Sequence, residues 1–117
     1  MDNKIHLSVV IPAYNEEKTI SATLLDMDKY LSKQNYPYEI IVVSDGSKDN
    51  TVRVAEKMKE LVKNLRVIDN KENHGKGWVV RQGMLESRGE FRLFTDADNA
   101  TTIDHIERAW PLLEQGY

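Results

Sequence analysis

The sequence predicts an α/β fold: a Rossmann-like parallel β-sheet with helices on both faces. Short apolar, β-branched runs alternate with segments of helical periodicity along the chain, as in repeated βαβ units. The run at 39–43 is almost continuously apolar, which is typical of a strand buried inside a parallel sheet. With 117 residues, the chain is long enough for one domain with a small core. We therefore expect right-handed crossovers between parallel strands.

The first strand–helix unit begins close to the N-terminus. Residues 7–11 form an apolar, β-branched run that Pro12 ends. Asn15 is a favourable helix cap, and Glu16 and Glu17 would lie in the first turn, where carboxylates complement the helix dipole. Apolar residues at helical spacing mark the inner face of this helix, namely Ile20, Leu24, Met27 and Leu31.

Three further strands are expected, at 39–43, 65–69 and 91–95, and the last of them should be buried. Turn-forming residues at 44–47 follow the second strand. The helix after that turn carries apolar residues at helical spacing, which should therefore face the core. They are Val54, Ala55, Met58, Leu61 and Val62.

Two helices are expected in the C-terminal half. The first runs from about Trp78 to Ser87, and Gly89 is suited to terminate it. The second would be capped by Thr102 and kinked or shortened by Pro111. Trp78 is expected to pack in the core or to be half-buried.

Polar residues gather after each of the four predicted strands. These clusters are 12–16, 44–49, 73–76 and 96–99. In open parallel sheets, ligands bind outside the carboxyl ends of the strands. Because all four clusters fall at such ends, we expect them to converge on one edge of the sheet and to form a binding site there.

Asp96-Ala97-Asp98 is the most informative of these clusters. Two carboxylates two residues apart in an extended chain point to the same side, where they could hold a hard divalent cation. Asp26-Met27-Asp28 has the same spacing but lies in a helical pattern, where positions i and i+2 diverge by about 200°. The position of Asp96 and Asp98 at a strand end favours a metal site over an accident of composition.

Asp45, Lys76 and Arg81 each allow two interpretations. Asp45 could accept a hydrogen bond from a ribose hydroxyl or a base N–H, or it could be an ordinary turn or capping residue. Lys76 could neutralise a diphosphate with help from Arg81, or both could be solvated surface cations. The chain has neither a P-loop nor a Gly-x-Gly-x-x-Gly motif after its first strand.

The composition excludes several other classes. The net charge is −3 and no basic block is present, which argues against nucleic acid as a partner. Cysteine is absent, so disulfides and thiolate metal sites are excluded. The three histidines do not have the spacing of zinc ligands, and the longest apolar run is far too short to span a membrane.

Taken together, four segments resemble the inverting nucleotide-sugar glycosyltransferases of the GT-A fold. These segments are SVVIPAYNEE, EIIVVSDGSKDNT, NHGKG and LFTDADNAT, in that order. The NHGKG loop and the DADNAT sequence are most similar to the dolichyl-phosphate (polyprenyl-phosphate) β-glucosyltransferases, and the mannosyl counterparts are also similar. The resemblance implies the nucleotide-sugar-binding half of a GT-A domain.

The resemblance also implies roles for residues of the nucleotide site. Pro12, Tyr14 and Glu16 would line the pocket, and Asp45 would contact the uridine. The more common family pattern has two acidic residues before the glycine of the second motif. Here Ser44 takes the first of those positions, so Asp45 would act alone.

The remaining implied residues lie near the phosphates. Lys76 and Arg81 would approach the base or the diphosphate, and Ala97 would contact the nucleotide. Asp96 and Asp98 would form the DxD element that binds Mg²⁺ or Mn²⁺, with Asp98 favoured as the direct ligand and Asp96 nearer the ribose or a bridging water.

The resemblance implies a donor, an acceptor and a location for the protein. The donor would be a nucleotide sugar, with UDP-glucose favoured and GDP-mannose as an alternative, and the acceptor a lipid phosphate or a glycan. Residues 1–117 would be a single, truncated N-terminal domain that is inactive in transfer by itself. We expect a cytoplasmic protein, peripheral at the membrane face in its full-length form. A homo-oligomer is a further possible partner state. The alternative function from another class is a non-catalytic nucleotide-binding or self-associating module.

Overall fold

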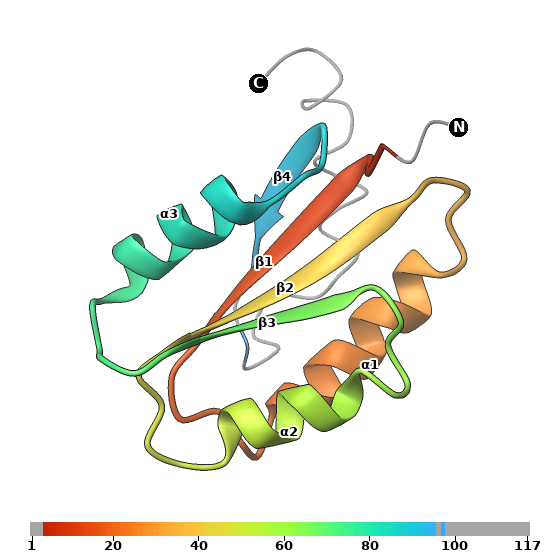
Figure 1. Cartoon of the computed structure of the whole chain (residues 1–117). Coiled ribbons are helices and arrows are strands. Elements are labelled where there is room, and N and C mark those ends of the chain that lie inside the picture. Colours follow the sequence, from red (N-terminus) through yellow and green to blue (C-terminus); the bar gives the residue numbers. More distant parts are fainter. Residues whose placement is uncertain (1–3, 96, 98–117) are drawn as a thin grey trace.

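The protein is an α/β sandwich of one parallel sheet and three helices, in a computed structural model that describes residues 4–95 and 97. The sheet has the strand order β3-β2-β1-β4, and every pairing is parallel (Figure 1). The predicted fold class is confirmed. In chain order the elements are β1 (Leu7–Ala13), α1 (Ile20–Leu31), β2 (Tyr38–Asp45), α2 (Thr51–Met58), β3 (Leu65–Asn70), α3 (Lys76–Glu86) and β4 (Phe91–Phe94).

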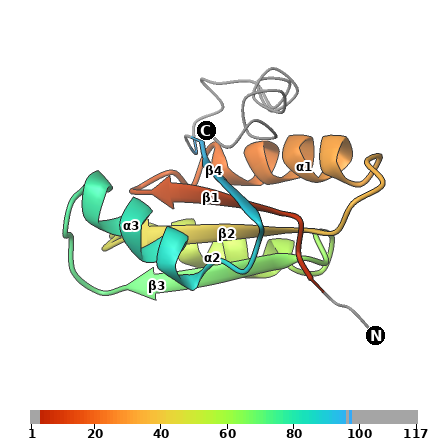
Figure 2. The same cartoon turned by 90° about the horizontal axis from the view of Figure 1, so that it is seen from above.

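The helices cover opposite faces of the sheet (Figures 1 and 2). Val9 and Ile11 of β1 pack in a core cluster with residues of α1 and α2, whereas Val10, between them, packs with Val79 of α3. This alternation follows from the two-residue period of a strand. Because both faces are covered, β1 and β2 are buried along almost their whole length, which explains their nearly continuous apolar sequences.

Gly83 sets the distance between α3 and the sheet. A Cβ atom at this position would lie 2.4 Å from Val10 Cγ1 and 3.1 Å from Val43 Cγ2. The helix backbone therefore rests directly on β1 and β2, which any larger residue would prevent.

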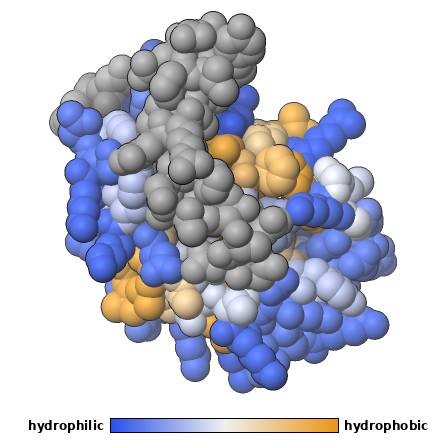
Figure 3. Space-filling model, turned by 180° about the vertical axis from the view of Figure 1, so that it is seen from behind, coloured by the Kyte–Doolittle hydropathy of each residue, from blue (hydrophilic) through white to orange (hydrophobic). Residues whose placement is uncertain are grey.

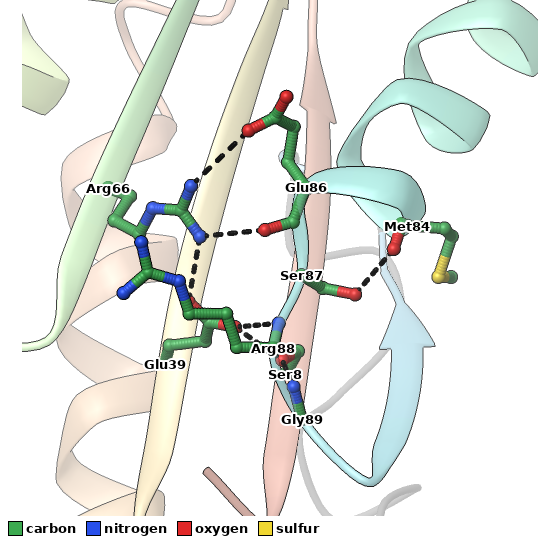
Figure 4. A network of polar contacts seen from close by, with 8 residues as sticks. All are labelled: Ser8, Glu39, Arg66, Met84, Glu86, Ser87, Arg88 and Gly89. Atoms are coloured by element: carbon green, nitrogen blue, oxygen red, sulfur yellow. Dashed lines mark hydrogen bonds and ion pairs between the residues drawn. The ribbon is translucent and has the colours of Figure 1, made fainter. Parts of the chain in front are cut away.

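The amino ends of the strands are joined by a buried carboxylate. Glu39 is only 4% exposed, and its side chain accepts hydrogen bonds from Ser8 Oγ (2.6 Å), the Arg88 backbone N–H (2.7 Å) and Arg66 Nη1 (3.0 Å) (Figure 4). Ser8 Oγ in turn accepts a hydrogen bond from the Gly89 N–H at 2.8 Å. Residues on β1, β2, β3 and the segment before β4 thus meet at one charged group.

The surroundings of Glu39 favour its ionised form. Burial by itself raises the pKa of a carboxyl group, but the hydrogen bonds from Ser8, the Arg88 N–H and Arg66 outweigh it and hold the pKa of Glu39 below its ordinary value. The carboxylate is therefore charged at neutral pH and fully paired.

The start of the first helix differs from the prediction. α1 begins at Ile20, not just after Asn15, and Thr19 is the residue that precedes it. Asn15 has a positive φ of 52°, and its side-chain oxygen accepts a hydrogen bond from the Lys48 N–H instead of capping α1. The segment from Asn15 to Lys18 is a loop. The N–H groups of its first three residues bind side chains of the β2–α2 loop and of the first residue of α2.

Burial differs from the prediction at Leu61 and in β4, and the end of α3 also differs from the prediction. Leu61, expected on an inner face, is 64% exposed because α2 ends at Met58. Residues 91–95 were expected to be buried, yet β4 alternates between half-buried and exposed residues and Phe94 is 48% exposed. Within the described sheet, β4 has a neighbour on one side only. Gly89 does not end α3; it lies against Ser8, with no positive φ, after the helix has ended at Glu86.

The expected helix after Thr102 lies outside the described residues. None of the described helices is long and apolar enough to cross a membrane. Where grey atoms do not cover it, the face in Figure 3, behind that of Figure 1, is mostly hydrophilic with a few apolar patches.

Replacing Glu39 with glutamine should destabilise the protein by on the order of 2 kcal/mol at pH 7, because Arg66, the Ser8 hydroxyl and the Arg88 N–H lose their charged partner. The pKa of Glu39 is lowered by folding, so its contribution is complete above the unfolded-state pKa of about 4.3 and is lost as the pH falls through the folded-state value. The difference between wild type and Glu39→Gln should therefore shrink as the pH falls below about 4.

Urea unfolding of both proteins between pH 7 and pH 3 measures this difference. Glu56→Gln is the matched control, because Glu56 forms an exposed pair with Lys59 at 2.9 Å and should change stability by less than about 0.5 kcal/mol. Equal losses for the two variants at pH 7 would contradict the assignment.

Candidate functional site

A cavity of about 200 Å³ opens at the carboxyl ends of β1 and β2. The end of β1, the loop after it, the end of β2, the start of α3 and the segment after β4 all contribute to its wall. The predicted convergence of polar clusters therefore takes the form of one cavity. Its lining residues are Pro12, Ala13, Tyr14, Glu16, Asp45, Lys76, Val79 and Ala97.

Two loops are fastened together beside this cavity. The Asn15 N–H donates to Ser47 Oγ at 3.1 Å, and the Glu16 N–H donates to Thr51 Oγ1 at 2.8 Å. The Lys48 N–H returns a hydrogen bond to Asn15 Oδ1 at 2.8 Å. These bonds join the loop after β1 to the loop after β2, and so fix Tyr14 and Glu16 relative to the end of β2.

Asp49 adds further hydrogen bonds between these two loops. Its carboxylate accepts hydrogen bonds from the Thr51 N–H at 2.9 Å and from the Glu17 N–H at 3.3 Å, and a further one from the Thr51 hydroxyl. Burial raises the pKa of such a group, but these hydrogen bonds outweigh it and lower the pKa of Asp49. Asp49 is thus an ionised structural residue that holds the start of α2.

Asp45 lies at the centre of the site and holds the third loop. It is 5% exposed, its Oδ1 accepts a hydrogen bond from the His74 N–H at 2.6 Å, and its Oδ2 accepts one from the Gly75 N–H at 3.0 Å. The Asn73 side chain also donates to the Asp45 carbonyl at 3.1 Å. Asp45 therefore orders the loop before α3 and is also one of the residues that line the cavity.

Gly46 is required where these loops meet. Its φ is +71°, and a Cβ atom at this position would lie 2.6 Å from the Asn73 backbone nitrogen. Both the backbone conformation and the close approach exclude a side chain. The glycine of the predicted turn thus brings the chain after β3 against the end of β2.

The two predicted cations are placed differently. Lys76, the first residue of α3, lines the cavity, and its Nζ lies 5.8 Å from the centre of the Phe94 ring. Arg81 lies outside the cavity and lines a separate groove of α3 with Trp78, Gln82 and Leu85. Trp78 was expected in the core or half-buried; it is 46% exposed and stacks on His74 at 3.9 Å.

The described part of the chain contains only the middle of the Asp96-Ala97-Asp98 motif. Ala97 is 3% exposed, packs in the core cluster under α1 and α2, and lines the cavity. Asp96 and Asp98 lie outside the described residues. Among residues 4–95 and 97, no group of three or more carboxylates and histidines could hold a metal ion.

Sequence reasoning missed two apolar residues of the cavity wall, Ala13 and Val79. β1 continues through Pro12 and Ala13, two residues beyond the predicted end at Ile11. Val79 is the first buried residue of α3. The β-branched run at the start of α3 was a signal for Val79. Nothing in the local sequence indicated that β1 continues through Pro12.

The chain matches a known family over almost its whole length. The sequence model described as glycosyl transferase family 2 matches residues 8–117. The protein belongs to this family. The resemblance found in the four sequence motifs is confirmed.

Curated relatives at about 40% identity have one described activity. The chain is 44% identical to the human dolichyl-phosphate β-glucosyltransferase, over 94% of this chain and 35% of that protein. It is 42% identical to the Drosophila melanogaster protein of the same name, over 95% of this chain and 36% of that protein. The chain thus spans about a third of the length of these relatives.

Solved glycosyltransferase structures share the fold. The Staphylococcus aureus protein TarS 1–349, in complex with UDP-GlcNAc, superposes with a TM-score of 0.74 at 31% identity, over 95% of this chain and 32% of TarS. The mannosyltransferase PcManGT from Pyrobaculum calidifontis, in complex with GDP-Man and Mn²⁺, superposes with a TM-score of 0.69 at 27% identity, over 81% of this chain and 28% of that one. The GT-A-type fold predicted from the sequence is confirmed.

Replacing Gly46 with alanine should destabilise the protein by roughly 2 kcal/mol or more, because the new Cβ would meet the Asn73 backbone in a left-handed conformation. Thermal unfolding measures this loss. Gly77→Ala is the control: Gly77 lies within α3 with nothing within 4 Å of an added Cβ, and alanine there should stabilise the helix by up to about 1 kcal/mol. A Gly46→Ala protein as stable as wild type would contradict this account of the loop.

Proposed function

We propose that this chain is the nucleotide-sugar-binding portion of an inverting glycosyltransferase that transfers glucose from UDP-glucose to a polyprenyl or dolichyl phosphate. The observation that carries the proposal is the cavity at the carboxyl ends of the strands, which Asp45 and Lys76 line together with apolar residues. The curated relatives support the donor and the acceptor, since they are dolichyl-phosphate β-glucosyltransferases.

The chemistry of the cavity suits a nucleoside diphosphate. Asp45 can accept a hydrogen bond from a ribose hydroxyl or a base N–H. Lys76 brings a positive charge that attracts a diphosphate, and the glycines on either side of it allow the backbone to come close. The walls formed by Pro12, Ala13 and Val79 are apolar and offer surface to the base or the sugar.

A divalent cation fits the donor set that the sequence supplies. Asp96 and Asp98 are hard oxygen ligands of the kind that Mg²⁺ and Mn²⁺ prefer, and they flank Ala97, which lines the cavity. When bound, such an ion offsets the negative charge that develops on the leaving diphosphate. Lys76, which lines the same cavity, would add to this stabilisation.

The acceptor side of the reaction requires little from this chain. A phosphate acceptor is already anionic at neutral pH, so it needs little help from a general base. The bond to the sugar would form as the bond to the diphosphate breaks, in one displacement with inversion. The role of residues 4–95 and 97 is to bind and orient the donor, and holding the acceptor in line falls to other parts of the enzyme.

UDP should raise the melting temperature of the chain in the presence of Mn²⁺, by roughly 4 °C or more at ten times its Kd. Lys76→Met should weaken UDP binding about tenfold, because a charge-assisted contact with the diphosphate is lost. Lys57→Met is the matched control, since Lys57 is an exposed residue of α2 away from the cavity. Isothermal titration calorimetry gives the affinities.

The melting-temperature assay with Mn²⁺ also compares the two candidate donors. UDP-glucose should stabilise the chain more than GDP-mannose does. The reverse order would favour a mannosyl transfer enzyme instead. No shift with either nucleotide and Mn²⁺ would contradict the proposed function.

The 117-residue chain should transfer little or no sugar by itself, because it spans only 36% of the length of a relative with the full activity. Incubation with radiolabelled UDP-glucose and a polyprenyl phosphate, followed by extraction of the lipid, measures transfer. Robust glycolipid formation by this chain would show that it also positions the acceptor.

A further inference from the structure

One buried hydrogen bond connects the first helix to the segment after the last described strand. Thr23 Oγ1, in the first turn of α1, donates to the carbonyl oxygen of Ala97 at 2.7 Å. Thr23 is 1% exposed and Ala97 is 3% exposed, so water does not compete for this bond. The two residues are 74 positions apart in the sequence.

We propose that Thr23 is a positioning residue that holds the Asp96-Ala97-Asp98 motif in the orientation needed to bind a divalent cation and a nucleotide diphosphate. This inference rests on the proposed function of the cavity. It adds a residue that no sequence motif of the site contains, on a helix that contributes no residue to the cavity wall.

The argument begins with the two anchors on Ala97. Its methyl group packs in the core cluster shared with α1, and its carbonyl binds Thr23. A side chain and a carbonyl held at once fix both the position and the rotation of this peptide segment. Asp96 and Asp98 are the sequence neighbours of Ala97, so the proposal is that a fixed Ala97 prepares the motif for its ligands.

The type of residue at position 23 supports this role. A threonine in a helix interior is slightly unfavourable, and its hydroxyl ordinarily donates to the carbonyl one turn earlier in the same helix. Here the Thr23 backbone N–H binds the Thr19 carbonyl at 3.1 Å, while the hydroxyl donates to Ala97. The hydroxyl therefore satisfies a buried carbonyl of the motif.

A merely structural threonine would behave differently. Its replacement would lower stability and leave ligand affinity unchanged in the folded protein. Replacing a positioning residue changes the affinity for metal and nucleotide separately from stability. Mutations of residues that orient metal ligands commonly lower metal affinity by about 10- to 100-fold. The two roles are therefore distinguished by comparing affinity with melting temperature.

The test compares Thr23→Val and Thr23→Ser with wild type by calorimetric titration of UDP, with Mn²⁺ and with the metal removed by EDTA. Thr23→Val keeps the shape but not the donor, and should weaken Mn²⁺-dependent UDP binding about tenfold. It should change the binding of UDP without metal by less than about twofold. Thr23→Ser keeps the hydroxyl and should retain the affinity of wild type.

Leu31→Val is the stability control, because Leu31 is a buried residue at the last turn of the same helix. It should lower the melting temperature and leave both affinities unchanged. Thr23→Ala is a second variant should Thr23→Val not fold, and its Mn²⁺-dependent affinity should fall in the same way.

The outcomes separate this inference from the proposed function. If wild type binds UDP with Mn²⁺ and Thr23→Val binds it equally well, the inference is overturned and the proposed function stands. The inference is also overturned if Thr23→Val and Leu31→Val lose affinity alike, since Thr23 then acts only through stability. If wild type binds neither UDP nor Mn²⁺, both proposals are wrong.

Discussion

The position of β1 between β2 and β4 is the constraint on which the rest of the molecule depends. β1 pairs in parallel with both neighbours, with Leu7 opposite Tyr38 on one side and opposite Phe91 on the other. Parallel pairing places the carboxyl ends of adjacent strands on the same edge, so the loops that follow them must meet there. The cavity is a consequence of this topology, and its chemistry then depends on which side chains the loops carry.

The two ends of the sheet are stabilised in different ways. At the amino ends, one buried carboxylate, Glu39, binds Ser8, Arg66 and the Arg88 N–H, and Ser8 extends the network to the Gly89 N–H. At the carboxyl ends, hydrogen bonds run from loop to loop and leave a cavity between the loops. The Glu39 network at the amino ends of the strands and the hydrogen bonds between loops at their carboxyl ends both support the shape of the cavity before a ligand binds.

Sequence reasoning found the fold and most of the cavity, because both follow from local patterns. Apolar runs and turn residues located all seven described elements, and six residues expected in the nucleotide site line one cavity, namely Pro12, Tyr14, Glu16, Asp45, Lys76 and Ala97. The errors arose where distant contacts override local preference. Asn15 has the sequence of a helix cap, yet its N–H and side chain bind the β2–α2 loop. The bond from Thr23 to Ala97 joins segments whose proximity no local pattern reports.

The hydrogen bonds of Asp45 bear on how a nucleotide would lie in the cavity. A carboxylate has about four acceptor sites, and three are in use here: the His74 N–H binds Oδ1 at 2.6 Å, and the Gly75 N–H is shared between Oδ2 at 3.0 Å and Oδ1 at 3.3 Å. Roughly one site remains, enough for a single hydroxyl or N–H donor of a ligand. The charge of Asp45 also repels a phosphate, whereas Lys76 attracts one. Under the proposed function, the nucleoside would therefore lie toward Asp45 and the diphosphate toward Lys76. Because position 44 is a serine, the one carboxylate of Asp45, which orders the loop before α3, would also be the group that contacts the nucleoside.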